Sequence, residues 1–364
     1  MSKRLRHVSI LASLIAIALL ATACESSSLP DPDESSPQLT SPSARAAEVT
    51  APDLPMTKIS LDPYIRFDRL TAEDGLSNDL VWDVAQDDLG FLWFATADGL
   101  NRYDGASFKI YRSDRGDPHS LSQSYVRTLF VDQSGALWIG TWDSGLNQYD
   151  HEKDRFIRYR HDPDDPYSLS DDSVRAVYED RAGAIWVGTM GGLNKFDRAS
   201  EQFTRYRHDP DDPHSLSHDI VWTIFEDRSG VLWVGTGDGL NRLNPDTQTF
   251  VHYRHDPDDP TSLSNDAVRS ILEDSTGAFW IGTEGGVNRF NRETGQSTRY
   301  QYDPADPQSL SFDQVFVIHE DRAGNLWVGT RGGGLNRFDR ETEAFTHYRH
   351  DAADPYSLSG DGPI

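Results

Sequence analysis

The alternation of apolar and polar residues along the chain predicts short β-strands that come in groups of four. Between residues 168 and 207, β-branched and aromatic residues fall into four runs, at 173–178, 184–189, 193–197 and 202–207. A turn from Asp180 to Gly183 separates the first two runs and a glycine turn precedes the third, because aspartate and glycine favour turns. Four short antiparallel strands per unit are typical of a β-propeller blade.

The same unit returns at a nearly constant spacing. One tryptophan marks the second predicted strand of every copy, and the six are Trp93, Trp138, Trp186, Trp233, Trp280 and Trp327. The steps between them are 45, 48, 47, 47 and 47 residues, which is the repeat length of propeller blades. We therefore predict an all-β propeller over residues 56–359 with six complete blades, in which the tryptophans pack between blades.

A loop rich in aspartate and proline joins each unit to the next. In the copy at 161–170, two prolines exclude strand pairing, so this loop should link an outer strand to the next inner strand. Its acids could suggest calcium, but the loop lacks the ligand alternation and the glycine of a calcium loop. We expect a structural turn with no metal or cofactor. The repeated histidines are also expected to be structural, namely His161, His208, His255 and His350.

Both ends of the predicted propeller depart from the repeat. Residues 64–70 look like an outer strand without a blade of its own, and the last connector, with residues 354–359, is followed only by a short tail, 360–364. Two interpretations stay open. One is an incomplete seven-bladed propeller whose remaining strands lie outside this chain, which we favour. The other is a six-bladed ring with a redundant strand.

The first 55 residues predict export and tethering. Three basic residues precede an apolar run from Val8 to Ala23, which is too short for a membrane span but typical of a signal peptide over residues 1–23. The only cysteine, Cys24, follows small residues as in a bacterial lipobox, although alanine replaces the leucine expected three positions earlier. A lipidated Cys24 is the favoured interpretation; an ordinary signal peptide or an uncleaved anchor are the alternatives. Residues 24–55 are rich in Ser, Pro and Asp and read as a disordered tether.

Charge narrows the range of partners. The formal charge of −25 disfavours nucleic acid and anionic membranes as partners. We therefore expect a periplasmic or otherwise extracytoplasmic protein that meets the membrane only through an N-terminal lipid. The low hydrophobic content of 37% and the aromatic content of 11% suit thin β-layers joined by aromatic side chains.

The repeat pattern resembles a known family. The sequence Asp-x-x-Gly, then Trp, Gly-Thr and Gly-Leu-Asn-Arg, with Ser-Leu-Ser before the inner strand, is similar to the two-component regulator propeller repeat over roughly residues 63–359. The resemblance implies the periplasmic sensor region of a hybrid histidine kinase or diguanylate cyclase. It also implies a seven-bladed propeller that binds an oligosaccharide. The chain carries no kinase or cyclase signature, so a downstream signalling protein or missing C-terminal domains are the expected partners.

Positions that vary between repeats are the candidates for ligand recognition. After the inner-strand valine or its equivalent, the copies carry an arginine or an aromatic residue: Trp82, Arg127, Arg175, Trp222, Arg269 and Phe316. If the valines pack between blades, alternation places these side chains along the central channel. Arginines bind carboxylate or sulfate groups, and aromatic rings stack on sugars, so an anionic oligosaccharide fits. The alternative is that the arginines pair with the aspartates of the connectors.

One more residue breaks the repeat. Trp142 stands in the glycine-rich loop after Gly-Thr and is our best single candidate for ligand contact, although it could instead cap the blade. No nucleophile or metalloprotease motif occurs, so we expect no enzyme and no catalytic residues. Two further functions stay open. One is a lipoprotein scaffold for other proteins, and the other is a lyase or glycosidase that uses acids such as Asp98 and Asp238.

Overall fold

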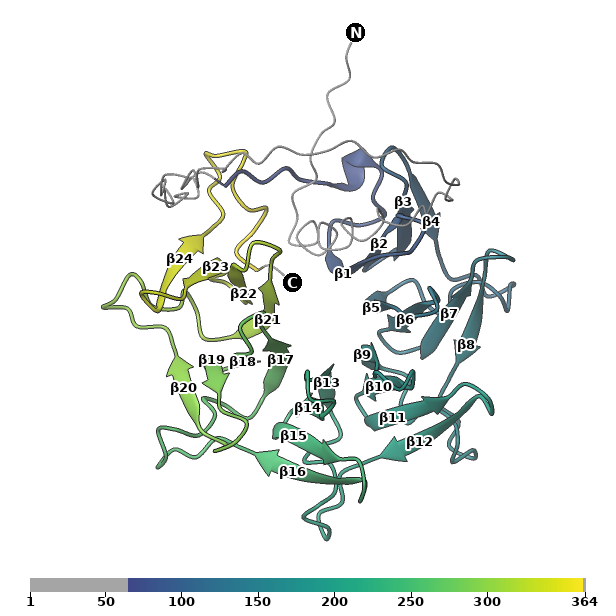
Figure 1. Cartoon of the computed structure of the whole chain (residues 1–364). Helices are drawn as coiled ribbons and strands as arrows, with labels where there is room; N and C mark the ends of the chain where they lie inside the picture. The colour runs from purple at the N-terminus through teal and green to yellow at the C-terminus, as the bar shows by residue number, and fades with distance from the viewer. Residues whose placement is uncertain (1–64, 363–364) are drawn as a thin grey trace, which may run out of the picture.

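The structure is a computed structural model that describes residues 65–362. These residues form a ring of six four-stranded antiparallel sheets (Figure 1). Blade 1 follows a short 3-10 helix, η1 (Ala72–Asp74), and consists of β1 (Val81–Gln86), β2 (Leu92–Thr96), β3 (Gly99–Tyr103) and β4 (Phe108–Tyr111). Blade 2 consists of β5 (Val126–Val131), β6 (Leu137–Thr141), β7 (Leu146–Asp150) and β8 (Arg155–Tyr159). Blade 3 consists of β9 (Val174–Glu179), β10 (Ile185–Thr189), β11 (Gly192–Asp197) and β12 (Gln202–Tyr206).

The other three blades repeat this plan. Blade 4 consists of β13 (Val221–Glu226), β14 (Leu232–Thr236), β15 (Gly239–Asn244) and β16 (Thr249–Tyr253). Blade 5 consists of β17 (Val268–Glu273), β18 (Phe279–Thr283), β19 (Gly286–Phe290) and β20 (Ser297–Tyr300). Blade 6 consists of β21 (Val315–Glu320), β22 (Leu326–Thr330), β23 (Gly334–Asp339) and β24 (Ala344–Tyr348). The predicted all-β propeller with six complete blades is confirmed, and the strands of blade 3 lie within one residue of their predicted bounds.

The repeated tryptophan is held by the aspartate of the preceding turn. In blade 3, Trp186 Nε1 donates to Asp180 Oδ2 at 2.7 Å, while Oδ1 accepts from the backbone N–H of Ala182 and Ala184. The same Trp-to-Asp bond recurs in the other five blades at 2.7–2.9 Å. One carboxylate therefore closes the turn and also orients the indole, which explains why this pair is the most regular feature of the sequence.

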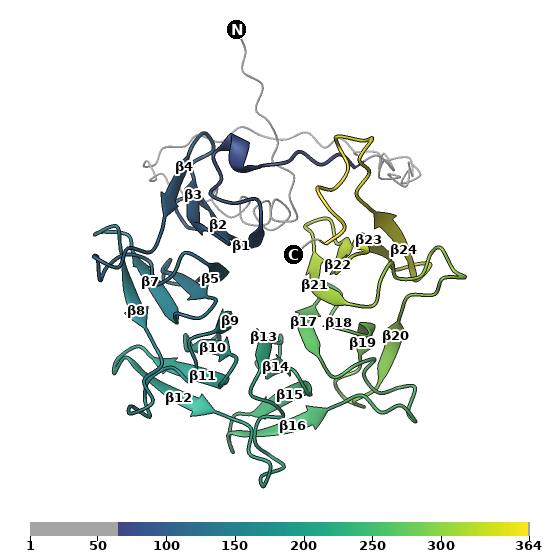
Figure 2. The same ribbon diagram turned by 180° about the vertical axis from the view of Figure 1, so that it is seen from behind.

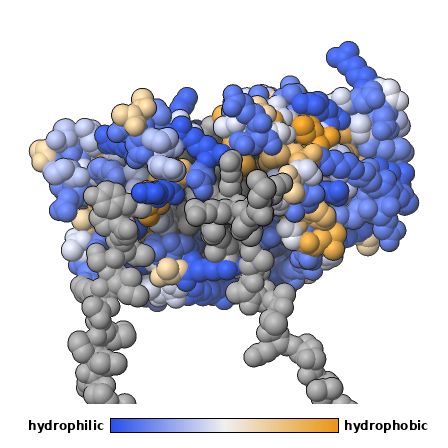
Figure 3. All heavy atoms as spheres, turned by 90° about the horizontal axis from the view of Figure 1, so that it is seen from above, coloured by the Kyte–Doolittle hydropathy of each residue, from blue (hydrophilic) through white to orange (hydrophobic). Residues whose placement is uncertain are grey.

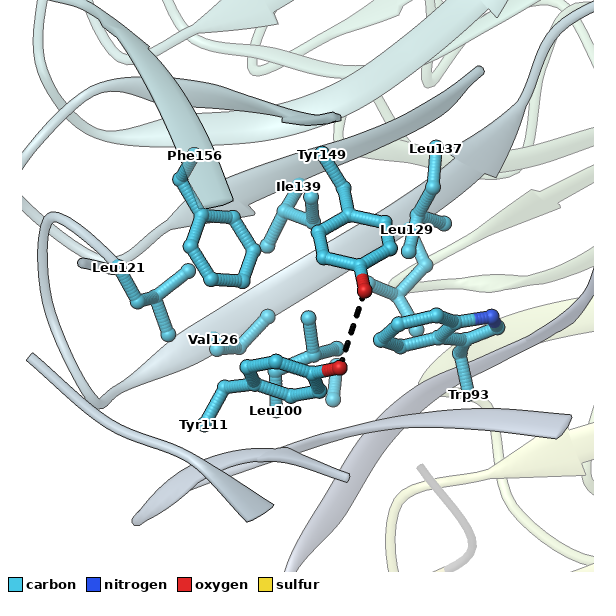
Figure 4. Close-up of a cluster of buried hydrophobic side chains, with 11 residues drawn as sticks. Trp93, Leu100, Tyr111, Leu121, Val126, Leu129, Leu137, Ile139, Tyr149 and Phe156 are labelled. Atoms are coloured by element: carbon cyan, nitrogen blue, oxygen red, sulfur yellow. Dashed lines mark hydrogen bonds between the residues drawn. The ribbon is translucent and has the colours of Figure 1, made fainter. Parts of the chain in front are cut away.

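The hydrophobic core is divided among the boundaries between blades. At the first boundary, Trp93 of blade 1 packs against Tyr149 of blade 2, while Phe156 packs against Tyr111 and Tyr149 at the other end of the same cluster (Figure 4). Corresponding clusters occupy the next four boundaries. The tryptophans are at most 5% exposed, so their predicted packing role is confirmed. A sixth and smaller cluster, Leu76, Val84 and Phe94, lies on blade 1 itself, whereas the other clusters join two blades, so the stability of a blade depends largely on its neighbours.

The inner-strand valines also pack between blades. Val174 lies so close to the second strand of blade 2 that a Cβ on Gly140 would come within 2.7 Å of its Cγ1. Gly188 and Val221 repeat this contact between blades 3 and 4. The prediction that residues such as Arg127 line the channel assumed that these valines pack between blades, and the structure confirms this packing.

The connectors are fixed by their own polar side chains. In the connector at 161–170, His161 Nδ1 hydrogen-bonds the carbonyl oxygen of Leu169 at 2.7 Å, and Asp162 accepts from the backbone N–H of Asp164. His208, His255 and His350 make the corresponding bond at 2.7–2.9 Å. The repeated histidines are structural, as predicted.

The segment before blade 1 lies beside the last connector (Figures 1 and 2). Residues 65–70 form no regular strand, yet Phe67 N donates to the carbonyl oxygen of Tyr356 at 2.9 Å, just as Phe203 N donates to Tyr167 at 2.8 Å. The Phe67 and Tyr348 rings meet edge to face at 6.3 Å, close to the 6.0 Å between Tyr159 and Phe203.

Arg69 completes this correspondence. Its guanidinium donates to the carbonyl oxygens of Ser357 and Leu358, as Arg205 in β12 does to Ser168 and Leu169. Residues 65–70 therefore occupy the place of an outer strand, although they are not a regular strand. Inner strands of consecutive blades pack together from β1 and β5 to β17 and β21, but within the described residues β21 has no comparable contact with β1. The predicted seventh blade stays a prediction.

The remaining predictions for the termini cannot be followed in the structure. The signal peptide, Cys24, the tether at 24–55 and residues 56–64 and 363–364 lie outside the described residues. Between residues 65 and 362, no helix has the length and apolar character to cross a membrane. The outer surface in Figure 3 is mainly hydrophilic, in keeping with the acidic composition.

Candidate functional site

Each inner strand contains a β-bulge at the predicted ligand-binding position directly after its first valine. In blade 2, Val126 pairs with Thr141 and Thr128 pairs with Gly140, so Arg127 has no partner across the ladder. All six blades share this irregularity, and the unpaired residues are Trp82, Arg127, Arg175, Trp222, Arg269 and Phe316. A β-bulge re-aims the side chain of the unpaired residue, so this side chain no longer follows the regular alternation between the two faces of the sheet. We call these six half-buried residues the bulge ring.

Each arginine of the bulge ring lies beside an aromatic residue of a neighbouring blade. The guanidinium of Arg127 lies 3.9 Å from the Trp82 ring centroid, and that of Arg269 lies 3.7 Å from the Trp222 centroid. Arg175 lies 5.6 Å from Trp222 on one side, and Arg269 lies 5.8 Å from Phe316 on the other. These distances are within the range of cation–π attraction. The structure thus brings all six predicted residues together across blade boundaries.

Trp142 joins the bulge ring from its loop. Arg175 lies 4.3 Å from the Trp142 ring centroid and Arg127 lies 6.0 Å from it, so this indole stands between two arginines. The indole also lies 5.1 Å from the Tyr125 ring and is 39% exposed. Sequence reasoning missed Tyr125, although it is the only aromatic residue directly before an inner-strand valine or its equivalent. Trp142 is therefore accessible to a ligand and also fixed by its neighbours.

The arginines of the bulge ring are not neutralised by the connectors. Arg269 forms an ion pair with Glu284, but within residues 65–362 neither Arg127 nor Arg175 has a carboxylate partner. Burial, together with repulsion by Arg175 and Arg269, lowers the pKa of Arg127 to about 10. Burial and Arg269 also lower the pKa of Arg175. Both stay protonated at neutral pH, so positive charge accumulates in an otherwise acidic protein.

Two buried donors in the bulge ring lack acceptors. Trp82 Nε1 and Arg175 Nε are shielded from solvent and make no hydrogen bond in the part of the chain that the structure describes. A buried donor without an acceptor costs about 1–3 kcal/mol. A ligand that offers acceptor oxygens would remove this cost. Among residues 65–362, a carboxylate that could compete with a ligand is paired with Arg269 and with neither of the other two arginines.

A half-buried acid lies beside the ring and was not predicted. Asp83, next to Trp82 in β1, accepts from Leu129 N at 2.8 Å and from Thr128 Oγ1 at 3.0 Å, both in blade 2. Burial raises the pKa of Asp83 to about 6. The signal in the sequence is that the other five repeats carry Thr, Ala, Thr, Ser and Val at this position.

The acids considered for catalysis are already paired. Asp98 accepts from Arg112 at 3.0 Å, and Asp238 forms an ion pair with Arg254 at 3.0 Å. Among the residues that the structure describes, no three His, Cys, Asp or Glu side chains are grouped so that they could hold a metal ion. The geometry favours binding of an anion more than acid–base chemistry.

Comparison with known proteins identifies the repeats. The model of the family "Two component regulator propeller" matches six segments, at 75–98, 120–143, 168–191, 215–238, 262–285 and 309–332. Histidine kinase P4 of Formosa agariphila is 50% identical over 56 residues, which is 15% of this chain and 4% of the kinase.

Solved structures agree with this result. The extracellular domain assigned to the hybrid two component system BT3049 of B. thetaiotaomicron is 30% identical, with a TM-score of 0.70 over 81% of this chain and 38% of that chain. Virginiamycin B lyase of Staphylococcus aureus is 16% identical, with a TM-score of 0.54 over 74% of this chain and 83% of the lyase, and shares the fold alone.

The chain spans well under half of the BT3049 domain and a small part of the kinase. Each of the six matched segments nevertheless contains the first two strands of one blade, so every sheet in Figure 1 includes one copy of the repeat. The described part of the chain is therefore a β-propeller of the two component regulator propeller family.

Proposed function

We propose that this chain is an extracytoplasmic sensor propeller of a two component signalling system. The six repeats and the likeness to a histidine kinase and to an extracellular domain of a hybrid system support this role. The transmitter would belong to a different polypeptide or to further domains. An N-terminal lipid on Cys24 would hold the propeller at the membrane, in line with the signal-peptide pattern.

The bulge ring is the proposed ligand site, and an anionic oligosaccharide is the proposed ligand. The observation that carries this proposal is the accumulation of three guanidiniums between aromatic rings, two of them without a carboxylate partner among the described residues. A carboxylate or sulfate group would relieve the repulsion between the arginines by accepting charged hydrogen bonds. The exposed face of Trp142 would stack on a sugar ring.

Titration calorimetry with acidic oligosaccharides tests this proposal. The variant Arg127→Ala, Arg175→Ala, Arg269→Ala should lose measurable binding while its circular dichroism spectrum stays unchanged. The matched control replaces three exposed arginines without ion pairs among the described residues, Arg115, Arg160 and Arg322, by alanine. This control changes the net charge equally and should bind like wild type. Undiminished binding by the first variant would refute the site.

A protein-interaction scaffold is the second candidate, because the accessible ring of arginines and Trp142 could also receive an acidic peptide. The two are separated by comparing glycan-array binding with affinity capture from a periplasmic extract. Glycan binding that persists when the captured protein is added would favour the sensor. A lyase or glycosidase would instead turn over acidic polysaccharides, and the ion pairs of Asp98 and Asp238 argue against recruiting these acids.

A further inference from the structure

A second row of side chains lies beside the bulge ring, and one common backbone bond fixes its members. In blade 2, the backbone N–H of Trp142 donates at 3.1 Å to the carbonyl oxygen of Tyr125, the residue directly before the inner-strand valine. The other five blades repeat this bond at 2.9–3.2 Å. We call the six residues that donate it the loop row, and in blade order they are Ala97, Trp142, Met190, Gly237, Glu284 and Arg331.

Blades 2 and 3 keep the full charge of their arginines. Their members of the loop row, Trp142 and Met190, carry no charge. Neither Arg127 nor Arg175 forms an ion pair within residues 65–362, and both guanidiniums approach the Trp142 indole, at 6.0 and 4.3 Å from its centroid. Two acids attract these arginines without pairing with them, namely Asp83 and Asp171. A ligand anion against this indole would therefore meet two charged donors.

Blade 5 presents a neutral pair instead. Glu284 Oε1 accepts from Arg269 Nε at 3.1 Å and also from Nη2 of the same side chain. The Arg269 side chain is 17% exposed and that of Glu284 is 35% exposed, so the two charges cancel in a partly shielded place. A second ligand anion at blade 5 would meet a carboxylate as well as a guanidinium. Arg331 of blade 6 is exposed, so an ion pair with it would contribute little.

We propose that Glu284 determines the specificity of the bulge ring, which binds one anionic group at blades 2 and 3 and discriminates against a second at blade 5. This inference rests on the proposed oligosaccharide function and narrows the ligand to a chain with a single acidic sugar beside neutral ones.

The chemistry of the two places differs in the required way. At blades 2 and 3 the acidic group accepts from Arg127 and Arg175 while its sugar stacks on Trp142. At blade 5 a sugar hydroxyl can donate to Glu284 and accept from Arg269, because a hydroxyl does both. An ionised carboxylate only accepts, so it cannot bind Glu284 and is repelled by it.

Titration calorimetry tests this assignment with matched pairs of oligosaccharides of equal length, in which one member carries a single uronic acid and the other carries two. Wild type should bind both members of a pair within about threefold. Glu284→Gln frees the charge of Arg269, so it should bind the di-acidic member at least about tenfold more tightly than the mono-acidic one. Adding Arg269→Ala to this variant should remove the gain. The matched control, Asp238→Asn, removes an acid that pairs with Arg254 in the corresponding loop of blade 4 and should keep the wild-type ratio.

Three results would overturn the inference. The first is that the ratio of the two affinities is the same in Glu284→Gln as in wild type for every pair. The second is an equal gain in Asp238→Asn, which would reduce the effect to net charge. The third is a wild type that prefers the di-acidic member tenfold, and this result decides the matter even if Glu284→Gln fails to fold. Failure of the proposed function looks different, because wild type would then bind neither member of any pair.

Discussion

The guanidinium of Arg269 lies 3.7 Å from the centroid of the Trp222 ring, although the two residues belong to the inner strands of neighbouring blades. Arg127 in blade 2 and Trp82 in blade 1 repeat this relationship at 3.9 Å. The candidate site is therefore built across blade boundaries, and no single blade could form it. This arrangement makes ligand binding sensitive to how the blades are packed.

Trp142→Ala should separate binding from folding. The side chain is 39% exposed, so its loss should change the free energy of unfolding by less than about 1 kcal/mol. Affinity for an acidic oligosaccharide should fall about tenfold, because one sugar-stacking surface is lost. Chemical denaturation and calorimetry on the same preparation check both values. Trp142→Phe is the control and should recover part of the affinity. If Trp142→Ala binds like wild type, Trp142 only caps the end of its blade and does not contact the ligand.

Asp83 should make stability fall as the pH rises from about 4 to 6. The pKa of this buried carboxyl is raised from 3.8 to about 6, so in this range the folded protein holds a proton that the unfolded chain has released. The penalty is complete above pH 6 and reaches up to about 3 kcal/mol. Asp83→Asn keeps an acceptor for Leu129 N and removes the titration. Urea unfolding of both proteins at pH 4, 5, 6 and 7 measures this difference, and parallel stability curves would contradict the prediction.

The turn aspartates should differ in importance according to their partners. Asp274 holds Trp280 and also forms an ion pair with Arg340 from blade 6, whereas the Asp180 carboxylate has only Trp186 and turn backbone as partners in the described part of the chain. Asp274→Ala should destabilise by about 2–4 kcal/mol, because it removes the tryptophan acceptor and one of the two carboxylates around Arg340, which keeps Glu320. Asp180→Ala should cost about 1–3 kcal/mol.

Acid should weaken the Asp274 pair. Hydrogen bonds and the charge of Arg340 outweigh burial and lower the pKa of Asp274 to about 2. The stability from this group is present above pH 4 and is lost as the pH falls towards 2. The destabilisation by Asp274→Ala should therefore shrink between pH 5 and pH 2.5 in thermal unfolding. A constant difference between variant and wild type over this range would show that the ion pair contributes little.

Phe67 and Arg69 should hold the last connector. Phe67→Ala removes the edge-to-face contact with Tyr348, and Arg69→Ala removes the bonds to Ser357 and Leu358. We expect a loss of about 1–2 kcal/mol for Phe67→Ala, since the ring is half-buried. Hydrogen exchange should speed up in residues 350–358 of either variant and stay unchanged in the connector at 161–170. Unchanged protection in both segments would show that residues 65–70 do not act as an outer strand.

Much of the scaffold could be predicted from the sequence, for physical reasons. The tryptophans, turn aspartates and glycines repeat because each meets the same steric demand in every blade, as Gly140 does against Val174. Comparing copies within one chain therefore revealed strands and packing without any structure. The variable residues stood out by the same comparison. The structure brings the six residues of the bulge ring and Trp142 together.

The site itself was less predictable. The alternation of side chains along a strand predicted correctly that Arg127 faces away from the packed valine. The β-bulge that leaves Arg127 without a ladder partner is a property of two paired strands and cannot be predicted from the sequence of one strand. Tyr125 and Asp83 were missed because their roles depend on the neighbouring blade.

Calorimetric titration of an acidic oligosaccharide and of its carboxyl-reduced, neutral counterpart into wild-type protein tests the central claim most directly. The two ligands differ only in charge, so their difference in affinity reports the arginines of the bulge ring. We predict that the acidic ligand binds at least about tenfold more tightly, and that this preference weakens with added salt. Equal affinity for both ligands, at low and at high salt, would contradict an anion-binding site.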